Sequence, residues 1–494
     1  MSHGLSKSRI ISNRQCPKRL WLTANRPDLL DDTATKAAME TGNNLGVIAR
    51  KLVPGGVLID AEDLRAALRQ TAQALAAKPR VPIFEATVQH AGVLVQADVL
   101  IPQGRRWRMV EVKSSASVKN YQVEDAAIQS WVFRQAGVPL CGEGIAHINT
   151  AFVYPGGDNY DGLLIEQHQS DAVAALQPQV PQWIDAAHKT LSLKRQPNIA
   201  AGAQCTDPFP CPFQDHCIPP QEGYPVHILP HGGKLAAQLQ AEGYTDLRDV
   251  PEGRLSNPRH ERVWAATRSG KPYINPSLRE TLRALPYPRI YIDFETLNPA
   301  IPLWAGTRPY QQIPFQWSCH IQQTDGSVEH QAFLAEGHED PRPEFIRTLL
   351  DAVGKTGPVL VWNQTFEKSR LKELAELYPQ LATKIRKLIG RMVDLWPLAR
   401  EHYYHPDMRG SWSIKDVLPT IAPDLAYDDL EVADGMMAQE VFRHILSPQI
   451  AENQRESKRR ALLAYCERDT LAMVRVVGVF SINHGVLHAK SRGN

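Results

Sequence analysis

The stretch IYIDFETLN, residues 290–298, decides what the second half of the chain is built around. Its β-branched and aromatic residues are those of a buried strand, yet Asp293 and Glu295 stand among them. Side chains two positions apart on a strand point to the same face of the sheet, so the two carboxylates are neighbours. A hard divalent cation such as Mg²⁺ or Mn²⁺ relieves their repulsion, because such ions prefer oxygen ligands. The stretch therefore predicts a strand that supplies half of a metal site.

Two later segments supply the other half. Residues 357–364, GPVLVWNQ, have the length and apolar character of a buried strand, and Glu367 opens the helical pattern that follows. Binding sites of α/β proteins form at the carboxyl ends of such strands. Residues 462–476, LLAYCERDTLAMVRV, predict a helix on which Tyr465 and Asp469, four positions apart, share a face. We therefore expect these side chains to meet at one edge of an α/β layer structure.

The segments DFET, WNQTFE and YCERD, in this order, resemble the three motifs of DnaQ-like exonucleases of the tyrosine (DEDDy) type. The resemblance implies an RNase H-like fold in which two metal ions are held by Asp293, Glu295, Glu367 and Asp469. It also implies that Tyr465 orients the attacking water. Glu367 stands where the family usually has Asp, which shifts or weakens the second ion unless the backbone compensates. The alternative is a set of ordinary charged strand and helix faces. Asp394 and Asp416 are candidates for an auxiliary role at the site, and a helix cap or a surface position is the alternative for each.

A second set of charges lies in residues 92–115, GVLVQADVLIPQGRRWRMVEVKSS, which predict two strands joined by a Pro-Gln-Gly turn. Asp98 comes near the end of the first strand. On the second strand, Glu111 and Lys113 share one face and valines occupy the other. A solvated hairpin edge explains such a pattern in many proteins, but folding does not require these charges. A functional site is the other explanation.

This arrangement resembles the core of the PD-(D/E)XK nucleases of the RecB-like branch, with Asp on one strand and Glu-x-Lys on the next. The resemblance implies that Asp98 and Glu111 bind a catalytic Mg²⁺ or Mn²⁺ and that Lys113 orients or activates water. It further implies that Glu85, in the preceding strand VPIFEATV, completes the ligand set.

A helix predicted for residues 123–137 carries Gln129, which resembles the glutamine of the Gln-x-x-x-Tyr motif of that family. Phe133 replaces the tyrosine and lacks its hydroxyl group. Many relatives also place a histidine ligand early in the domain, whereas this chain has none between Leu30 and Asp60. The metal-binding set of this site is therefore expected to be incomplete.

Three cysteines, Cys205, Cys211 and Cys217, recur with five residues between neighbours in a proline-rich segment, and Cys16 offers a fourth thiol. This placement resembles the iron–sulfur RecB-like nucleases, in which four thiolates bind a [4Fe–4S] cluster that joins the two ends of the domain. Structural zinc also uses four cysteines, and unliganded thiols are the third alternative. The remaining cysteines are expected to be small buried residues, with Cys466 facing away from Tyr465: Cys141, Cys319 and Cys466.

With 494 residues, the chain exceeds what one core usually supports. We expect an α/β protein with a restriction-endonuclease-like PD-(D/E)XK domain at 1–220, a helical connector at 221–288 and an RNase H-like mixed-sheet domain at 289–494. No apolar run has the length of a signal peptide or a membrane span, so we expect a cytosolic protein.

The formal net charge of +2 shows no overall basic excess, so any nucleic-acid surface must be local. Candidates are GRRWR at 104–108, PKRLW at 17–21 and ESKRR at 456–460, of which the first two suit backbone contact with base stacking. We expect a metal-dependent nuclease acting on single-stranded DNA or DNA ends in repair, recombination or defence, from the 3′ end at the C-terminal site. The alternatives are one catalytic domain beside a nucleic-acid clamp, or a scaffold without catalysis. Oligomeric state and protein partners are not predicted.

Overall fold

A computed structural model of the chain describes residues 4–30, 33–218, 222–425, 427 and 429–481, with only the backbone described at 33–39. The chain divides into two compact units. Unit 1 comprises Met1–Pro220 and Pro299–Gln311, and unit 2 comprises Gln221–Asn298 and Gln312–Asn494. Both contain sheets and helices, so the expected α/β class is confirmed.

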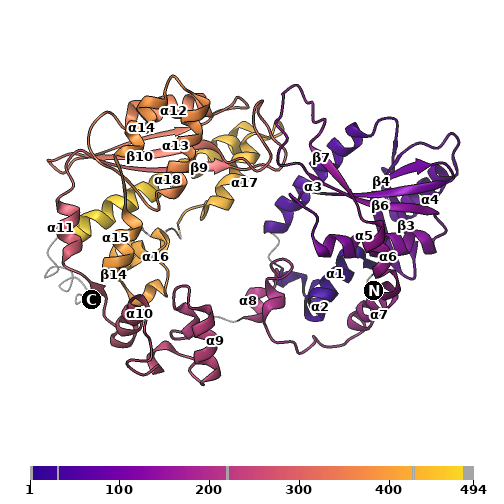
Figure 1. Cartoon of the computed structure of the whole chain (residues 1–494), viewed down its shortest axis with the longest axis horizontal. Coiled ribbons are helices and arrows are strands. Elements are labelled where there is room, and N and C mark those ends of the chain that lie inside the picture. Colours follow the sequence, from indigo (N-terminus) through magenta and orange to yellow (C-terminus); the bar gives the residue numbers. More distant parts are fainter. Residues whose placement is uncertain (1–3, 31–32, 219–221, 426, 428, 482–494) are drawn as a thin grey trace. The chain divides into compact units, whose positions relative to one another are not determined.

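Unit 1 is built on a mixed sheet in the order β2–β3–β4–β5–β6–β7, with β1 paired to β4 (Figure 1). Its strands are β1 (Leu5–Ser6), β2 (Val57–Leu58), β3 (Ile83–His90), β4 (Val93–Gln103), β5 (Arg106–Lys113), β6 (Leu140–Ile148) and β7 (Leu164–His168). Its helices are α1 (Lys7–Gln15), α2 (Pro17–Asn25), α3 (Thr33–Leu52), α4 (Leu64–Ala76), α5 (Asn120–Gln135), α6 (Ser170–Leu176), α7 (Val180–Leu191) and α8 (Gln214–Cys217). Strands β4 and β5 form the predicted hairpin, and α5 packs against β3, β4 and β6. Helix α5 thereby brings its polar side chains to the sheet strand that carries Glu111.

Unit 2 contains a sheet in the order β11–β10–β9–β12–β13 and a small ribbon of β8 and β14. Its strands are β8 (Tyr273–Ile274), β9 (Arg289–Leu297), β10 (Ile313–Gln322), β11 (Val328–Leu334), β12 (Val359–Val361), β13 (Met392–Asp394) and β14 (Tyr403–Tyr404). Its helices are α9 (Gly233–Ala241), α10 (Pro258–Ser269), α11 (Ser277–Arg283), α12 (Arg342–Ala352), α13 (Thr365–Leu377), α14 (Ala382–Gly390), α15 (Leu395–His402), α16 (Ile414–Ile421), α17 (Gly435–Ile445) and α18 (Glu452–Ser481). Strand β10 is antiparallel to β9 and β11, whereas β12 is parallel to β9 and β13.

The central strand β9 is covered on both faces, as Figure 1 shows for α18 and the group α12 to α14. Ile290, Ile292 and Phe294 pack with apolar residues of α12, α13 and α14 in one core. The alternating residues face α18, which contacts both β9 and β10. Asp293 is paired with Ser318 of β10 on this second face. The two acidic residues of β9 therefore lie between the sheet and a buried helix.

Residues 221–288, expected as a helical connector, contribute to the core of unit 2. Val226, Leu239 and Val263 join one apolar cluster with residues of α15, α16 and α18. The helices of this segment bury apolar side chains in that cluster, which also contains Tyr291 of β9 and residues of the long helix α18. No helix in the described part of the chain is long and apolar enough to cross a membrane.

Gly410 occupies a position of unit 2 that requires glycine for two reasons. Its φ is +83°, and a Cβ atom there would lie 1.7 Å from the carbonyl oxygen of Ile228. Gly326, in the turn after β10, shares the left-handed backbone with φ +89° but has open space around it. Backbone strain alone costs about 1–3 kcal/mol at such positions.

We expect Gly410→Ala to destabilise unit 2 by clearly more than Gly326→Ala, because only the first substitution also drives a methyl group into a backbone carbonyl. Thermal unfolding of the two variants, followed by circular dichroism, measures the difference. Equal losses of unfolding temperature would contradict the close approach of residues 228 and 410.

Candidate functional site

Three carboxylates of unit 2 converge: the ligand atoms of Asp293, Glu295 and Asp469 all lie within 4.8 Å of one another. Two come from β9 and the third from α18. Glu295 and Asp469 are each 8% exposed, and Asp293 is half-buried. All three line one pocket together with Lys415 and Tyr465. The strand and the helix predicted from the sequence thus bring their acidic residues to one place.

The electrostatics of this cluster disfavour three bare negative charges. Burial, reinforced by repulsion from Asp469, raises the pKa of Glu295 to about 8 and that of Asp293 well above its usual range. Burial also raises the pKa of Asp469 to about 6, although a hydrogen bond from Tyr427 opposes the shift. A divalent cation among the oxygens would reverse this penalty, since an opposite charge favours the ionised form. The donor set is entirely carboxylate and therefore suits Mg²⁺ or Mn²⁺.

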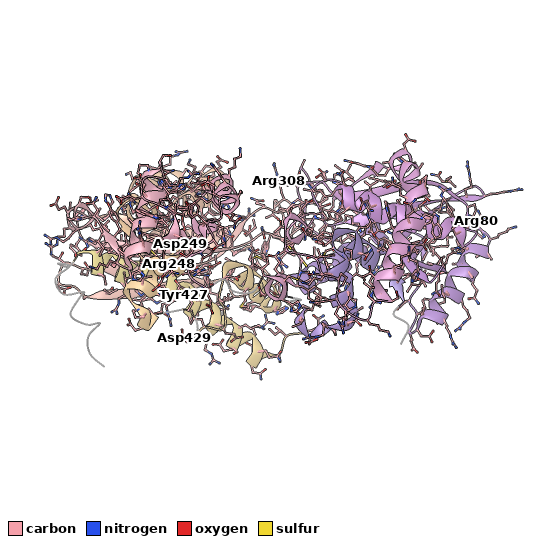
Figure 2. All side chains as sticks on the ribbon, turned by 90° about the horizontal axis from the view of Figure 1, so that it is seen from below. Arg80, Arg248, Asp249, Arg308, Tyr427 and Asp429 are labelled. Atoms are coloured by element: carbon pink, nitrogen blue, oxygen red, sulfur yellow. The ribbon has the colours of Figure 1, made fainter. Side chains whose placement is uncertain are left out.

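Two residues that contact the site were not predicted from the sequence. The Nζ of Lys415 on α16 donates to the hydroxyl oxygen of Tyr465 over 3.1 Å and to the carbonyl of Ala433 over 2.6 Å. Tyr427, labelled in Figure 2, donates its hydroxyl to the Oδ1 of Asp469 over 2.6 Å. Both residues lie in segments without a recognisable motif, so only the tertiary structure reveals them.

Glu367 lies in the first turn of α13 and is 2% exposed. It is not part of the group within 4.8 Å, but its charge contributes to the raised pKa values of Asp293 and Glu295. Its own pKa is raised to about 8, chiefly by burial. Its Oε2 has no hydrogen-bond partner in the described part of the chain. A buried carboxylate oxygen without a partner is what an additional ligand of an oxygen-bound ion would offer.

The auxiliary aspartates have structural partners. Asp394 caps α15 by accepting from the backbone N–H of Trp396, and it also accepts from Asn363 and Gln364. Asp416 accepts a hydrogen bond from the hydroxyl of Ser411. The capping role expected for Asp394 is confirmed.

Cys466, which was expected to face away from Tyr465, also reaches the site. Its Sγ lies 3.7 Å from the Oδ2 of Asp293. Residues 465, 466 and 469 are all buried on α18, which contacts β9 and β10. Cys319 is fully buried as expected, whereas Cys141 is only half-buried, with its Sγ 3.2 Å from the Oε1 of Gln103.

The predicted residues of unit 1 meet around Glu111, which is 2% exposed. Its carboxylate accepts from Lys113 over 2.8 Å, from Gln129 over 2.7 Å and from Lys7 over 2.5 Å. Lys113 also donates to Asp125 over 2.7 Å. Burial raises the pKa of Glu111, but Lys113 and Lys7 outweigh it and lower that pKa to about 2. Lys7 and Asp125 were not predicted, because neither stands in the hairpin motif.

Asp98 and Glu85 lie at the edge of this cluster. The Oδ2 of Asp98 accepts from the backbone N–H of Val112 over 2.6 Å, and burial followed by repulsion from Glu111 raises the pKa of Asp98 to about 7. Glu85 pairs with Arg50 at 3.7 Å. Within the described residues of unit 1, no three ligand side chains converge to within 4.8 Å. Two ammonium groups neutralise Glu111 where a metal ion was expected.

The four cysteines predicted to bind a cluster line one small pocket of unit 1: Cys16, Cys205, Cys211 and Cys217. Their sulfur atoms do not form a group within 4.8 Å among the side chains that the structure describes. A single zinc ion with Zn–S bonds of about 2.3 Å would hold tetrahedral thiolates about 3.8 Å apart. Among the described residues, no three of the four sulfur atoms are gathered that closely.

The basic segments differ in what they expose. Trp107 of GRRWR is 1% exposed and lies beneath Arg80, labelled in Figure 2, whose guanidinium carbon is 5.4 Å from the ring centre. The expectation that bases stack on Trp107 was therefore wrong. Trp21 of PKRLW is half-buried and donates its indole N–H to the carbonyl of Leu193. Arg459 of ESKRR donates to the carbonyl of Ala335.

Residues 290–413 match a family described as a domain of unknown function (DUF2779). An uncharacterized protein of Ureaplasma parvum is 29% identical over 211 residues, covering 38% of this chain and 30% of that protein. An uncharacterized protein of Mycoplasma pneumoniae is 27% identical over 207 residues, covering 38% of this chain and 31% of that protein. The matched part of this chain thus spans about a third of these relatives' length.

A family B DNA polymerase from the hyperthermophilic archaeon Pyrobaculum calidifontis was found among solved structures. It has a TM-score of 0.24 and 13% identity, and the match covers 39% of this chain and 24% of the polymerase. A TM-score this low does not establish a shared fold.

We expect the carboxylates of unit 2 to bind Mn²⁺. Asp469→Asn and Glu295→Gln should each weaken binding by more than ~10-fold, since even the loss of a group that only supports a ligand costs that much. Isothermal titration of the full chain with Mn²⁺ measures the effect. Asp351→Asn, a change at an exposed position, and Glu111→Gln serve as controls that keep this binding. Unchanged affinity in both cluster variants would exclude a metal site there.

Proposed function

We propose that the chain is a metal-dependent nuclease that hydrolyses phosphodiester bonds of DNA. In this proposal unit 2 is a DnaQ-like domain of RNase H fold that acts on a single strand from its 3′ end. The observation that carries the proposal is the convergence of Asp293, Glu295 and Asp469 within 4.8 Å at a pocket open to solvent. The order of the three sequence motifs supports it independently. The matched relatives are uncharacterized and add no function.

Divalent ions bound by these oxygens would supply an activated water and neutralise charge on the leaving oxygen, as pairs of ions about 3.5–4 Å apart do in phosphodiester hydrolysis. Asp293, Glu295 and Asp469 would hold the ions, and Glu367 would offer its unpartnered Oε2. Tyr427 fixes the Oδ1 of Asp469 by a hydrogen bond. Lys415 holds the hydroxyl of Tyr465 at the pocket wall, where it can orient water or the scissile phosphate.

For unit 1 we propose the PD-(D/E)XK fold of the restriction-endonuclease type. The close contacts of Lys7 and Lys113 with Glu111 favour a nucleic-acid clamp over a second catalytic centre. The reason is that a metal ion would have to displace an ammonium group from a carboxylate that already accepts three hydrogen bonds. In this second function, unit 1 holds DNA and unit 2 cuts it.

The cysteine pocket of unit 1 is proposed to hold a [4Fe–4S] cluster with a structural role. Support comes from the four thiols that line one pocket, since four thiolates are the ligand set of such clusters. Arg19 interacts electrostatically with Cys16 and Cys211, and its positive charge would offset the negative charge of ligated thiolates.

The nuclease proposal predicts that Mn²⁺-dependent degradation of end-labelled single-stranded DNA falls by more than ~100-fold in Asp293→Asn, because a lost metal ligand removes several kcal/mol of transition-state stabilisation. Glu111→Gln should leave the product ladder unchanged, since unit 1 does not cut DNA in this proposal. A ladder lost only in Glu111→Gln would move catalysis to unit 1. No cleavage by any form of the protein would favour the scaffold without catalysis.

The cluster proposal predicts iron and acid-labile sulfide in protein purified without oxygen, and loss of both in Cys211→Ser. Cys141→Ser is the matched control, since that thiol lies outside the pocket. Elemental analysis separates the outcomes. Zinc without sulfide would identify a zinc site, and the absence of both iron and zinc would show that the thiols are unliganded.

A further inference from the structure

A second group of metal-ligating side chains lies in unit 2, outside the carboxylate cluster. The ligand atoms of His320 on β10, His330 on β11 and Glu467 on α18 all lie within 4.8 Å of one another. His330 Nδ1 is already 3.7 Å from Glu467 Oε1. His320 is 4% exposed, whereas His330 and Glu467 remain accessible to solvent. An ion can therefore enter from solvent and meet a rigid, buried ligand.

The histidines are neighbours because of strand register. His320 and His330 are directly paired across β10 and β11, and their ring centres lie 4.5 Å apart. Glu467 reaches them from α18, which packs on both strands. No sequence motif joins these three residues, so the site depends on the sheet register and on helix packing.

A chain of hydroxyl groups fixes both rings. His330 Nε2 contacts the Oγ of Ser318 at 2.9 Å, Ser318 Oγ contacts Thr470 Oγ1 at 2.7 Å, and His320 Nδ1 contacts the same Thr470 oxygen at 2.8 Å. The Thr470 hydroxyl in turn donates to the carbonyl oxygen of Glu467 over 3.1 Å.

The protons of this chain can be assigned without conflict. Both rings donate an N–H to a hydroxyl oxygen, Ser318 donates to Thr470, and Thr470 donates to the carbonyl of Glu467. His320 Nε2 and His330 Nδ1 then keep their lone pairs for a ligand. Histidines that bind metals commonly use their second nitrogen in such a supporting hydrogen bond, which sets the tautomer and the ring orientation.

We infer that His320, His330 and Glu467 form a binding site for a transition-metal ion of the Zn²⁺ class, separate from the carboxylate cluster. Two imidazoles and one carboxylate are a donor set for zinc and its neighbours in the first transition row, whereas Asp293, Glu295 and Asp469 suit Mg²⁺ or Mn²⁺. Zn–N bonds of about 2.0–2.1 Å place tetrahedral ligand atoms about 3.4 Å apart, so the accessible side chains of His330 and Glu467 close the site.

Such an ion links the edge strand β11 to α18, two positions before Asp469 on the same helix. It would hold the helix that supplies Tyr465 and Asp469 against the sheet. The inference does not depend on nuclease activity, because its readout is metal binding.

The test is a Zn²⁺ titration of the full chain in excess Mg²⁺, which occupies the carboxylate oxygens. The wild type should bind one more equivalent of Zn²⁺ than His330→Gln or Glu467→Gln. His444→Gln and Glu456→Gln, changes at exposed positions of α17 and α18, should bind as the wild type does. Equal stoichiometry in His330→Gln and the wild type would overturn the inference.

Two further variants separate the alternatives. Ser318→Ala keeps all three ligands but removes a supporting hydroxyl, so it should weaken this equivalent by about 10–100-fold. A histidine pair that only packs across the strands would leave zinc binding unchanged in this variant. Asp469→Asn should retain the equivalent, and its loss there would assign the ion to the carboxylate cluster and refute the separate site.

Discussion

The packing of α18 on the face of β9 and β10 is the contact on which the rest of unit 2 depends. It places a thirty-residue helix, Glu452–Ser481, across a sheet face that carries acidic and hydroxyl side chains. Burying those groups costs free energy unless they are paired or coordinate a metal. At some positions of this face, hydrogen bonds offset the cost of burying the polar groups. At others, the polar side chains lie together as candidate metal ligands. Both candidate metal sites of unit 2 lie along this one contact.

Apolar packing on the opposite face of the same sheet offsets the free-energy cost of burying these polar groups. Ile290, Ile292 and Phe294 bury their side chains among α12, α13 and α14. Residues 221–288 bury further apolar surface against α15, α16 and α18. This apolar packing stabilises the polar face, because each buried aliphatic or aromatic side chain contributes about 1.5–3 kcal/mol. Strand β9 therefore has one apolar face that packs in the core and one face that carries the acidic side chains. Successive side chains of a strand point to opposite faces, which keeps the two sets apart.

The two units treat buried carboxylates in opposite ways. In unit 1 the ammonium groups of Lys7 and Lys113 neutralise Glu111, and its pKa is lowered to about 2. In unit 2 Lys415 lines the pocket of the carboxylates, and the pKa of Glu295 is nevertheless raised to about 8. A carboxylate that is already paired with ammonium groups binds a further cation weakly. Carboxylates that repel one another are stabilised when a cation binds between them. This contrast is the physical basis for proposing catalysis in unit 2 and DNA binding in unit 1.

The sequence by itself determined which residues of β9 share a face, because the two-residue period of a strand is local. It likewise determined that Tyr465 and Asp469 lie together, because helical spacing is local. The tertiary structure alone decided that Lys7, Lys415 and Tyr427 contact these sites, since each comes from a segment distant in sequence and without a motif. It also decided that Trp107 is buried and that Cys466 faces Asp293. The His320, His330 and Glu467 group follows the same rule, because strand pairing and helix packing bring together residues that no local pattern connects.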